Sequence, residues 1–340
     1  MKRIIIITIL ALSVVGAFLG GRYYNDNKRA NFSGDYVLYV RPDMSEDQIL
    51  DSLKSVVVRP RSLERAFEKM EVRDRMKPGR YVIEASFTSI YVARMIVFGW
   101  QTPQKLTLSG TIRKKEVLAR KIASQMMVDS ASVMHVLDSA EFLAPYGFTP
   151  ENVFAMILPD TYQMYWTASV NDIFDRFKKE YDRFWTPERL EKAEQQKLTP
   201  MQVSVMASIV SGETLKPHEY PLIAGVYLNR YRKGMKLQAD PTVAFCHDYT
   251  LDRILKKHLV VDSPYNTYKY KGLPPAPINV PPKACIDAVL NPDSHKYIYF
   301  CASPEFDGTH RFAVTYNEHL KNARAFQRAL TIRRKIKCGA

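Results

Sequence analysis

The sequence predicts an α+β protein with an N-terminal transmembrane helix, a small α/β domain and a larger, mixed, helix-rich domain. Three observations support this architecture. The chain begins with an uninterrupted apolar run, strand-like and helix-like stretches alternate up to about residue 105, and helical periodicity dominates after it. A length of 340 residues suits about two globular domains. We expect a cytoplasmic stub and signal anchor at 1–22, a linker at 23–32, the small domain at 33–105 and the large domain at 106–340.

The apolar run at residues 4–19 is near the short end of the roughly 17–25 residues that cross a bilayer, and it exceeds the roughly 7–15 apolar residues of a signal peptide. No A-x-A cleavage site follows it, so we expect an uncleaved signal anchor; a cleaved signal peptide is the alternative. Lys2 and Arg3 stay in the cytoplasm under the positive-inside rule. The rest of the chain is then expected on the periplasmic side of the inner membrane.

The small domain follows a polar linker and combines strands with helices. Ser45 and Gln48 form a capping-box pattern that opens a helix, and Gly99 ends another because glycine adopts the left-handed C-cap conformation. The spacing of apolar residues predicts strands at 36–40, 80–83 and 106–109, and helices at 62–70 and 89–98. A domain of this size is more typical of a binding module than of a catalytic domain.

The large domain carries the helical periodicity. Pro159, within LPDTY at 158–162, interrupts the pattern, and a strand-like stretch follows it. Apolar residues at helical spacing predict helices at 117–126, 173–184, 201–213, 220–233 and 284–290.

Basic residues outnumber acidic ones: 49 Lys and Arg against 35 Asp and Glu give a net charge of +14, which favours an anionic partner. No zinc-finger, RRM or bZIP pattern accompanies them, so nucleic acid is not an expected partner. The histidines and cysteines lack metal-ligand spacing and no P-loop occurs, so no metal or other cofactor is expected. In an exported chain Cys246, Cys285, Cys301 and Cys338 permit three disulfide pairings, and both a bridge and free thiols stay open.

Glu213 is the strongest candidate for chemistry. It follows Met206, Ile209 and Val210 by seven, four and three residues and therefore shares their face of a helix. An apolar stripe directed at the core thus ends in a carboxyl group, and burial favours its protonated form. Such an acid can donate a proton to a glycosidic oxygen. The alternative is an exposed glutamate near the end of the helix.

Polar and aromatic residues later in the chain suggest a groove for sugar rings. Aromatic faces stack on sugars, and amide, hydroxyl and carboxyl groups fix their orientation. We expect substrate-binding side chains from two segments: Gln238, Asp240, Thr242, Tyr265, Asn266, Thr267 and Tyr268. The segment GLPPAP at 272–277 follows and restricts the backbone. An ordinary loop locked by prolines is the alternative.

Several segments, in one order, resemble the YceG-like endolytic murein transglycosylases (MltG family). The resemblance extends from the anchor to about Asn322. The matching segments are MKPGRY at 76–81, LPDTY at 158–162, ASIVSGET at 207–214, IAGVYLNR at 223–230, GMKLQADPT at 234–242, SPYNTYKYKGLPPAPI at 263–278, YIYFCA at 297–302 and DGTHRF at 307–312.

The resemblance implies a single-pass anchor, a LysM-like domain at 33–105 and a catalytic domain at 106–340 that faces the cell wall. The family motif usually reads A-S-I-[IV]-E-x-E-T, and its second Glu, the catalytic acid, corresponds to Glu213. Ser211 replaces the first Glu, a departure that removes any role of that carboxylate in tuning the site. Glu219 matches a further acidic position, which we expect to bind substrate; an ion pair with a helix terminus is the alternative.

The implied reaction is non-hydrolytic cleavage of the β-1,4 bond between N-acetylmuramic acid and N-acetylglucosamine in nascent peptidoglycan. It leaves 1,6-anhydro ends and terminates or trims strand elongation. This mechanism needs Glu213 alone, whereas a hydrolase needs two carboxylates. Two alternatives stay open: a catalytically inactive wall-binding scaffold, which Ser211 motivates, and a hydrolytic muramidase with Asp240 as second carboxylate. The expected partners are glycan strands, the membrane and, from the resemblance, peptidoglycan synthases.

Overall fold

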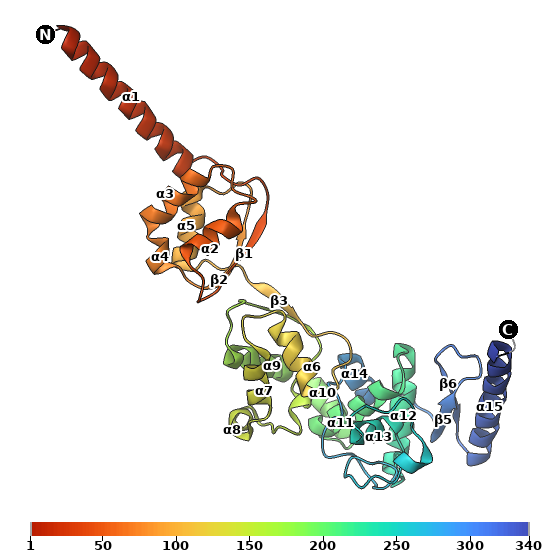
Figure 1. Cartoon of the computed structure of the whole chain (residues 1–340). Helices are drawn as coiled ribbons and strands as arrows, with labels where there is room; N and C mark the ends of the chain where they lie inside the picture. Colours follow the sequence, from red (N-terminus) through yellow and green to blue (C-terminus); the bar gives the residue numbers. More distant parts are fainter. Residues whose placement is uncertain (1, 339–340) are drawn as a thin grey trace. The chain divides into compact units, whose positions relative to one another are not determined.

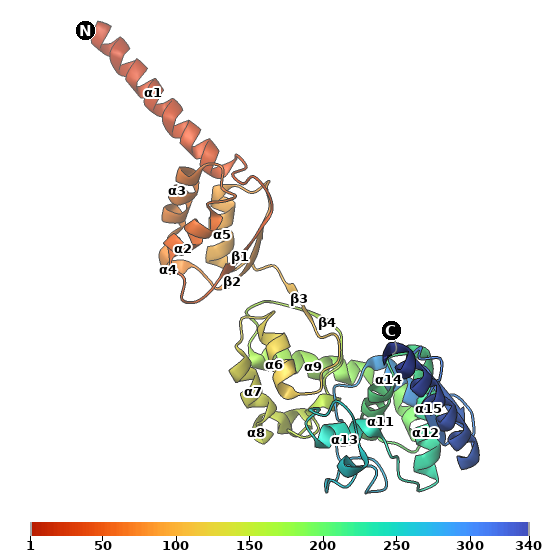
Figure 2. The same cartoon turned by 45° about the vertical axis from the view of Figure 1, so that its right-hand side comes forward.

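The computed structural model describes residues 2–338, with side chains described up to Arg333. The chain divides into two compact units, and Figures 1 and 2 show their elements coloured in chain order. Unit 1 comprises the chain up to Leu106 with Ile122–Asp129 and Thr161–Ser169; unit 2 comprises Thr107–Lys121, Ser130–Asp160 and the chain from Val170 onward. Both units mix helices with strands, in agreement with the predicted α+β class.

Unit 1 contains segments that the sequence did not place there. β3 (Gln104–Thr107) pairs with β4 (Thr161–Met164), and the side-chain amide of Gln104 donates to the backbone carbonyl of Gln125. The large domain expected at 106–340 is therefore not continuous in space. Strand pairing across such a separation leaves no local pattern in a sequence, so periodicity could not predict it.

α1 (Lys2–Asn27) is an apolar helix long enough to cross a membrane, and its most apolar window is not buried by any other part of the protein. The helix continues past the expected anchor end at 22, and Asp26 in its last turn accepts hydrogen bonds from Arg65 at 2.6 and 2.9 Å. Ala30 and Phe32 then form isolated β-bridges. The linker expected at 23–32 is instead ordered against unit 1.

The helices and the first two strands predicted for the small domain are confirmed, whereas the third strand, predicted at 106–109, lies at Gln104–Thr107. β1 (Tyr36–Val40) pairs antiparallel with β2 (Gly79–Ile83). Ser45 and Gln48 form the predicted capping box, and Gly99 ends the last helix with a φ of 69°. The helices of this domain are α2 (Glu46–Leu53), α3 (Pro60–Met70), α4 (Val72–Arg75) and α5 (Ser89–Phe98). Apolar side chains from these helices and from both strands form one core.

Beyond residue 107 the chain is mostly helical. The α-helices are α6 (Lys115–Ala123), α7 (Ser130–Leu137), α8 (Ala140–Leu143), α9 (Val170–Phe184), α10 (Pro187–Gln195), α11 (Pro200–Glu213), α12 (Tyr220–Arg232), α13 (Asp240–Cys246), α14 (Lys283–Leu290) and α15 (Tyr316–Cys338). Short 3₁₀ turns are η1 (Ala144–Tyr146), η2 (Val153–Ala155), η3 (Pro217–Glu219) and η4 (Lys256–His258). β5 (Tyr299–Ala302) pairs antiparallel with β6 (His310–Ala313), and α15 packs against both strands.

The main core of unit 2 lies between α11, α12 and α14, where Met206, Ile223 and Ile286 are fully buried. Thr199 and Gln202 form a capping box that starts α11, and Thr214 ends it in an extended conformation. The helix predicted at 201–213 is thereby confirmed. Glu213 is its last residue, held at the end of a buried helix.

The described cysteine side chains form no disulfide: Cys246, Cys285 and Cys301 are free thiols. Burial raises the pKa of the Cys285 thiol to about 12, so it stays protonated and unreactive. The side chain of Cys338 lies outside the described side chains, and its pairing stays a prediction.

Candidate active site

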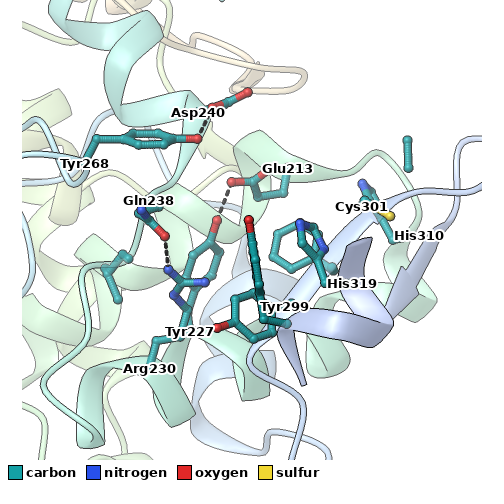
Figure 3. Close-up of a pocket in the computed structure, with 14 residues that line it drawn as sticks. Glu213, Tyr227, Arg230, Gln238, Asp240, Tyr268, Tyr299, Cys301, His310 and His319 are labelled. Carbon is teal, nitrogen blue, oxygen red and sulfur yellow. Dashed lines mark hydrogen bonds between the residues drawn. The ribbon is translucent and has the colours of Figure 1, made fainter. Parts of the chain in front are cut away.

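Glu213 lines a cavity of about 380 Å³ at the end of α11. Figure 3 shows its carboxyl group and the hydroxyl of Tyr227 directed at each other, with Asp240 and Tyr268 paired nearby. A second cavity of about 190 Å³ shares Glu213 and Asp240 with the first. The polar residues that line the first cavity are Glu213, Tyr227, Arg230, Gln238, Asp240, Tyr268, Tyr299, His310, Tyr316 and His319.

The surroundings of Glu213 favour its protonated form. Burial raises the pKa of Glu213 from the ordinary 4.5 to about 8. The hydrogen bond from Tyr227 to Oε1 acts in the opposite direction, and the negative charge of Asp240 adds to the rise in pKa. Glu213 therefore holds a proton near neutral pH, as a general acid must. The side chain is partly buried and faces a cavity, so it is not the exposed helix-end glutamate of the alternative.

Tyr227 and Arg230 lie one turn apart on α12 and line the first cavity together with Glu213. Tyr227 is 2% exposed, and its hydroxyl donates to Glu213. Arg230 is 7% exposed and donates to the backbone carbonyls of Lys236 and Ile298 at 2.9 and 3.0 Å. These bonds join α12 to the loop before α13 and to the residue that precedes β5.

Three of the expected substrate-binding residues reach the first cavity. Asp240 accepts a hydrogen bond of 2.6 Å from the hydroxyl of Tyr268, which places a tyrosine–carboxylate pair at the cavity wall. Gln238 accepts a hydrogen bond from Arg230 and adopts a φ of 54°, a left-handed conformation that turns the chain into α13. Gln238, Asp240 and Tyr268 therefore line the cavity that contains Glu213, and their binding of substrate stays a prediction.

The other four expected residues from these segments line neither cavity. Thr242 and Thr267 are buried and lie 2.9 Å apart, hydroxyl to hydroxyl, while the Asn266 amide donates to the carbonyls of Leu259 and Val261. Tyr265 packs on Phe245. The side-chain hydrogen bonds of the two threonines and of Asn266 are made within the protein, so these residues support the segments that present Asp240 and Tyr268. Sequence patterns cannot separate a polar side chain that faces a ligand from one that holds a turn.

Glu219 also lies away from both cavities. It is 2% exposed and accepts hydrogen bonds from the His310 backbone N–H and ring at 2.7 and 2.9 Å and from the Thr214 hydroxyl at 3.0 Å. Burial alone would raise the pKa of Glu219, but these donors hold it below its ordinary value. Glu219 thus ties β6 to the turn after Glu213, a supporting position instead of the expected contact with substrate.

Sequence reasoning assigned no site role to five residues that line the first cavity: Tyr227, Arg230, Tyr299, His310 and His319. Tyr227 and Arg230 fall in the IAGVYLNR segment, and the others come from the β5–β6 hairpin and α15, which form one wall of the cavity. Helical spacing could have placed Tyr227 and Arg230 on one face of α12, but not that face against Glu213. Within the described residues no group of three or more His, Cys, Asp or Glu side chains is placed to hold a metal ion.

Known proteins similar to this chain indicate its family. The chain is similar to proteins named endolytic murein transglycosylase from Bacillus subtilis (34% identical over 194 residues) and Streptococcus pneumoniae (26% identical over 171 residues). These matches cover 57% and 49% of this chain, and 49% and 31% of the relatives, so the chain spans about half or less of the curated relatives it matches.

A crystal structure of a yceG-like protein from Listeria monocytogenes is also similar. It is 26% identical, superposes with a TM-score of 0.57, and the match covers 84% of this chain and 98% of that one. Residues 38–325, which include Glu213 and every polar residue of the first cavity, match the YceG-like family. The chain belongs to the YceG-like family.

Proposed function

We propose that this chain is a membrane-anchored endolytic lytic transglycosylase of peptidoglycan. The observation that carries the proposal is Glu213, a carboxyl group with a pKa of about 8 that lines two cavities at the end of a buried helix. The relatives named endolytic murein transglycosylases support the choice of substrate.

Glu213 supplies both proton transfers of the reaction. Its protonated form donates to the oxygen of the β-1,4 bond between N-acetylmuramic acid and N-acetylglucosamine as the C1–O bond breaks. The resulting carboxylate accepts the proton of the muramic C6 hydroxyl while that oxygen bonds to C1. The products are a free 4-hydroxyl and a 1,6-anhydro end, and Glu213 regains its proton without consuming water.

The two cavities suit cleavage inside a strand. Because they share Glu213 and Asp240, sugars on each side of the cleaved bond have a place next to the acid. Arg113 and Tyr249 help to line the smaller cavity, and Tyr299 and Tyr316 the larger. Tyrosine rings offer faces on which sugars stack. Internal cleavage of this kind would terminate or trim growing strands.

The proposed location rests on α1. Among the described residues it is the one helix long and apolar enough to cross a membrane, and Lys2 and Arg3 at its start support a single-pass anchor with the catalytic unit on the periplasmic side of the inner membrane. Glycan strands are the substrate, and synthases that extend them are the proposed neighbours. A LysM-like character of the small domain is part of the same proposal.

Ser211, where the family motif has a glutamate, motivates one alternative, a binding scaffold without activity. Its hydroxyl lies 2.9 Å from the Ser208 carbonyl and 3.0 Å from Asn279 Oδ1, so the replacement is accommodated inside the fold with Glu213 in place, which argues against that alternative. The carboxylate of Asp240 supports the other alternative, a hydrolase with two acids.

Mass spectrometry of digested glycan strands separates the three functions. A lytic enzyme releases 1,6-anhydro ends, and Glu213→Gln abolishes them. Reducing ends would identify a hydrolase. Binding to isolated sacculi without cleavage would identify a scaffold and contradict the proposal.

A further inference from the structure

Tyr227 stands out among the residues with no assigned role, because it contacts the proposed acid directly. Its hydroxyl donates to Glu213 Oε1 across the contact between α12 and α11. We propose that Tyr227 is the positioning residue of Glu213: its hydroxyl fixes Oε1 and leaves Oε2 to carry the proton toward substrate. The inference rests on the proposed function and adds a residue to it.

Carboxylic acid chemistry explains the selection of one oxygen. A protonated carboxyl group has one O–H donor and one carbonyl-like acceptor. Since Tyr227 donates to Oε1, that oxygen is the acceptor and the acid proton belongs on Oε2. Burial raises the pKa of Tyr227 well above its ordinary value, so its hydroxyl stays a donor wherever Glu213 titrates.

The surrounding protein holds Tyr227 rigidly. The side chain is 2% exposed and belongs to the main core of unit 2, and its ring meets Phe300 edge to face with centroids 5.9 Å apart. A tyrosine has only two rotatable side-chain bonds, and both are fixed by this packing. The hydroxyl is therefore already positioned at Oε1 before substrate binds. Such preorganisation of a donor favours proton transfer.

The same bond acts after the proton has left. Glu213 then becomes a carboxylate in a site that disfavours negative charge, and the hydrogen bond from Tyr227 becomes charge-assisted. It opposes burial and Asp240, both of which raise the pKa of Glu213. The titratable or charged side chains that line the two cavities with Glu213 are Tyr227, Arg230, Asp240, Tyr268, Tyr299, Cys301, His310, Tyr316, His319, Arg113 and Tyr249.

The test is Tyr227→Phe in the full chain in detergent micelles, with ¹³C-glutamate labelling to follow the titration of Glu213. The Glu213 signal is identified by its absence in Glu213→Gln. We expect the titration midpoint to rise by about one pH unit, because a bond to the carboxylate is lost. We also expect release of anhydro ends to fall roughly tenfold or more, with the descending limb of the pH profile moved to higher pH.

A matched control is Tyr146→Phe. The Tyr146 hydroxyl donates to Asp175 at 2.7 Å, the same chemical pair, and neither residue lines either cavity. It should leave the Glu213 midpoint and product release unchanged. 3-Fluorotyrosine at position 227 keeps the core filled and strengthens the donor, so it should lower the Glu213 midpoint even if the phenylalanine variant unfolds.

The outcomes separate the two proposals. A wild-type chain that releases no anhydro ends rejects the proposed function, while the titration still reports on Tyr227. A Glu213 midpoint that neither Tyr227→Phe nor the fluorinated residue moves overturns the positioning role, whatever the activity.

Discussion

Gly212 lies so close to Pro241 that a Cβ on the glycine would meet the proline Cβ at 2.6 Å. Gly212 precedes Glu213 on α11, and Pro241 follows Asp240 on α13. The missing side chain therefore lets the two helices bring both carboxyl groups to one cavity. Few real Cβ atoms approach a neighbour so closely, and a proline ring has little freedom to move aside.

Gly212→Ala tests this close approach. The added methyl group should push α13 away from α11, lower the free energy of unfolding by about 1–3 kcal/mol and reduce cleavage. Denaturant unfolding and product release measure the two effects. Gly34→Ala is the control, because nothing lies within 4 Å of its added Cβ. If Gly212→Ala and Gly34→Ala had the same unfolding free energy and product release, the close approach of α11 and α13 would not be required.

The titration of Glu213 predicts how stability changes with pH. Its pKa is about 8 in the folded protein against an ordinary 4.5, so between these values the folded state keeps a proton that the unfolded chain has lost. Its contribution therefore destabilises the fold progressively as pH rises through this window. Glu213→Gln removes that dependence. The melting temperature of Glu213→Gln should therefore rise relative to that of the wild type as the pH increases from 5 to 8. A difference between the two melting temperatures that does not change with pH would contradict the raised pKa.

Asp240→Asn separates a neighbouring charge from a second catalytic carboxylate. Loss of its negative charge should lower the pKa of Glu213 and move the descending limb of activity to lower pH. Anhydro ends should persist, with a smaller loss than the roughly 10²–10⁴-fold expected for removing a general acid. A collapse as deep as that of Glu213→Gln would make Asp240 a partner in the chemistry.

We expect Glu219 to contribute to the stability of the folded protein and not to contact substrate. Glu219→Ala leaves the His310 and Thr214 donors without their acceptor in a buried place, which costs about 3 kcal/mol of unfolding free energy. The pKa of Glu219 is lowered, so its stabilisation is present above its ordinary pKa and disappears as pH falls through the folded value.

Chemical denaturation of Glu219→Ala at pH 7 and pH 3 checks both statements. The variant should lose stability at pH 7 and approach the wild type at pH 3. Glu305→Ala, which removes an exposed partner of Arg311, serves as control and should change little. A normal unfolding curve for Glu219→Ala at pH 7 with lost binding of glycan would instead restore Glu219 as a substrate contact.

The sequence by itself determined the local elements and the candidate acid. The capping box at Ser45, the glycine at position 99 and the spacing of apolar residues depend on neighbours within a few positions, so they can be recognised from the sequence alone. Glu213 was found in the same way, because a helix face is a local property. The order of motifs then indicated the family.

Only the tertiary structure decided which side chains meet that acid. Tyr227 lies fourteen residues after Glu213, and His310 and His319 come from the β5–β6 hairpin and α15. It also decided that Glu219 and Thr242 face inward, and that residues 122–129 and 161–169 join unit 1. These relationships depend on how separate elements pack, and contacts between distant elements have no period or spacing that a single sequence displays.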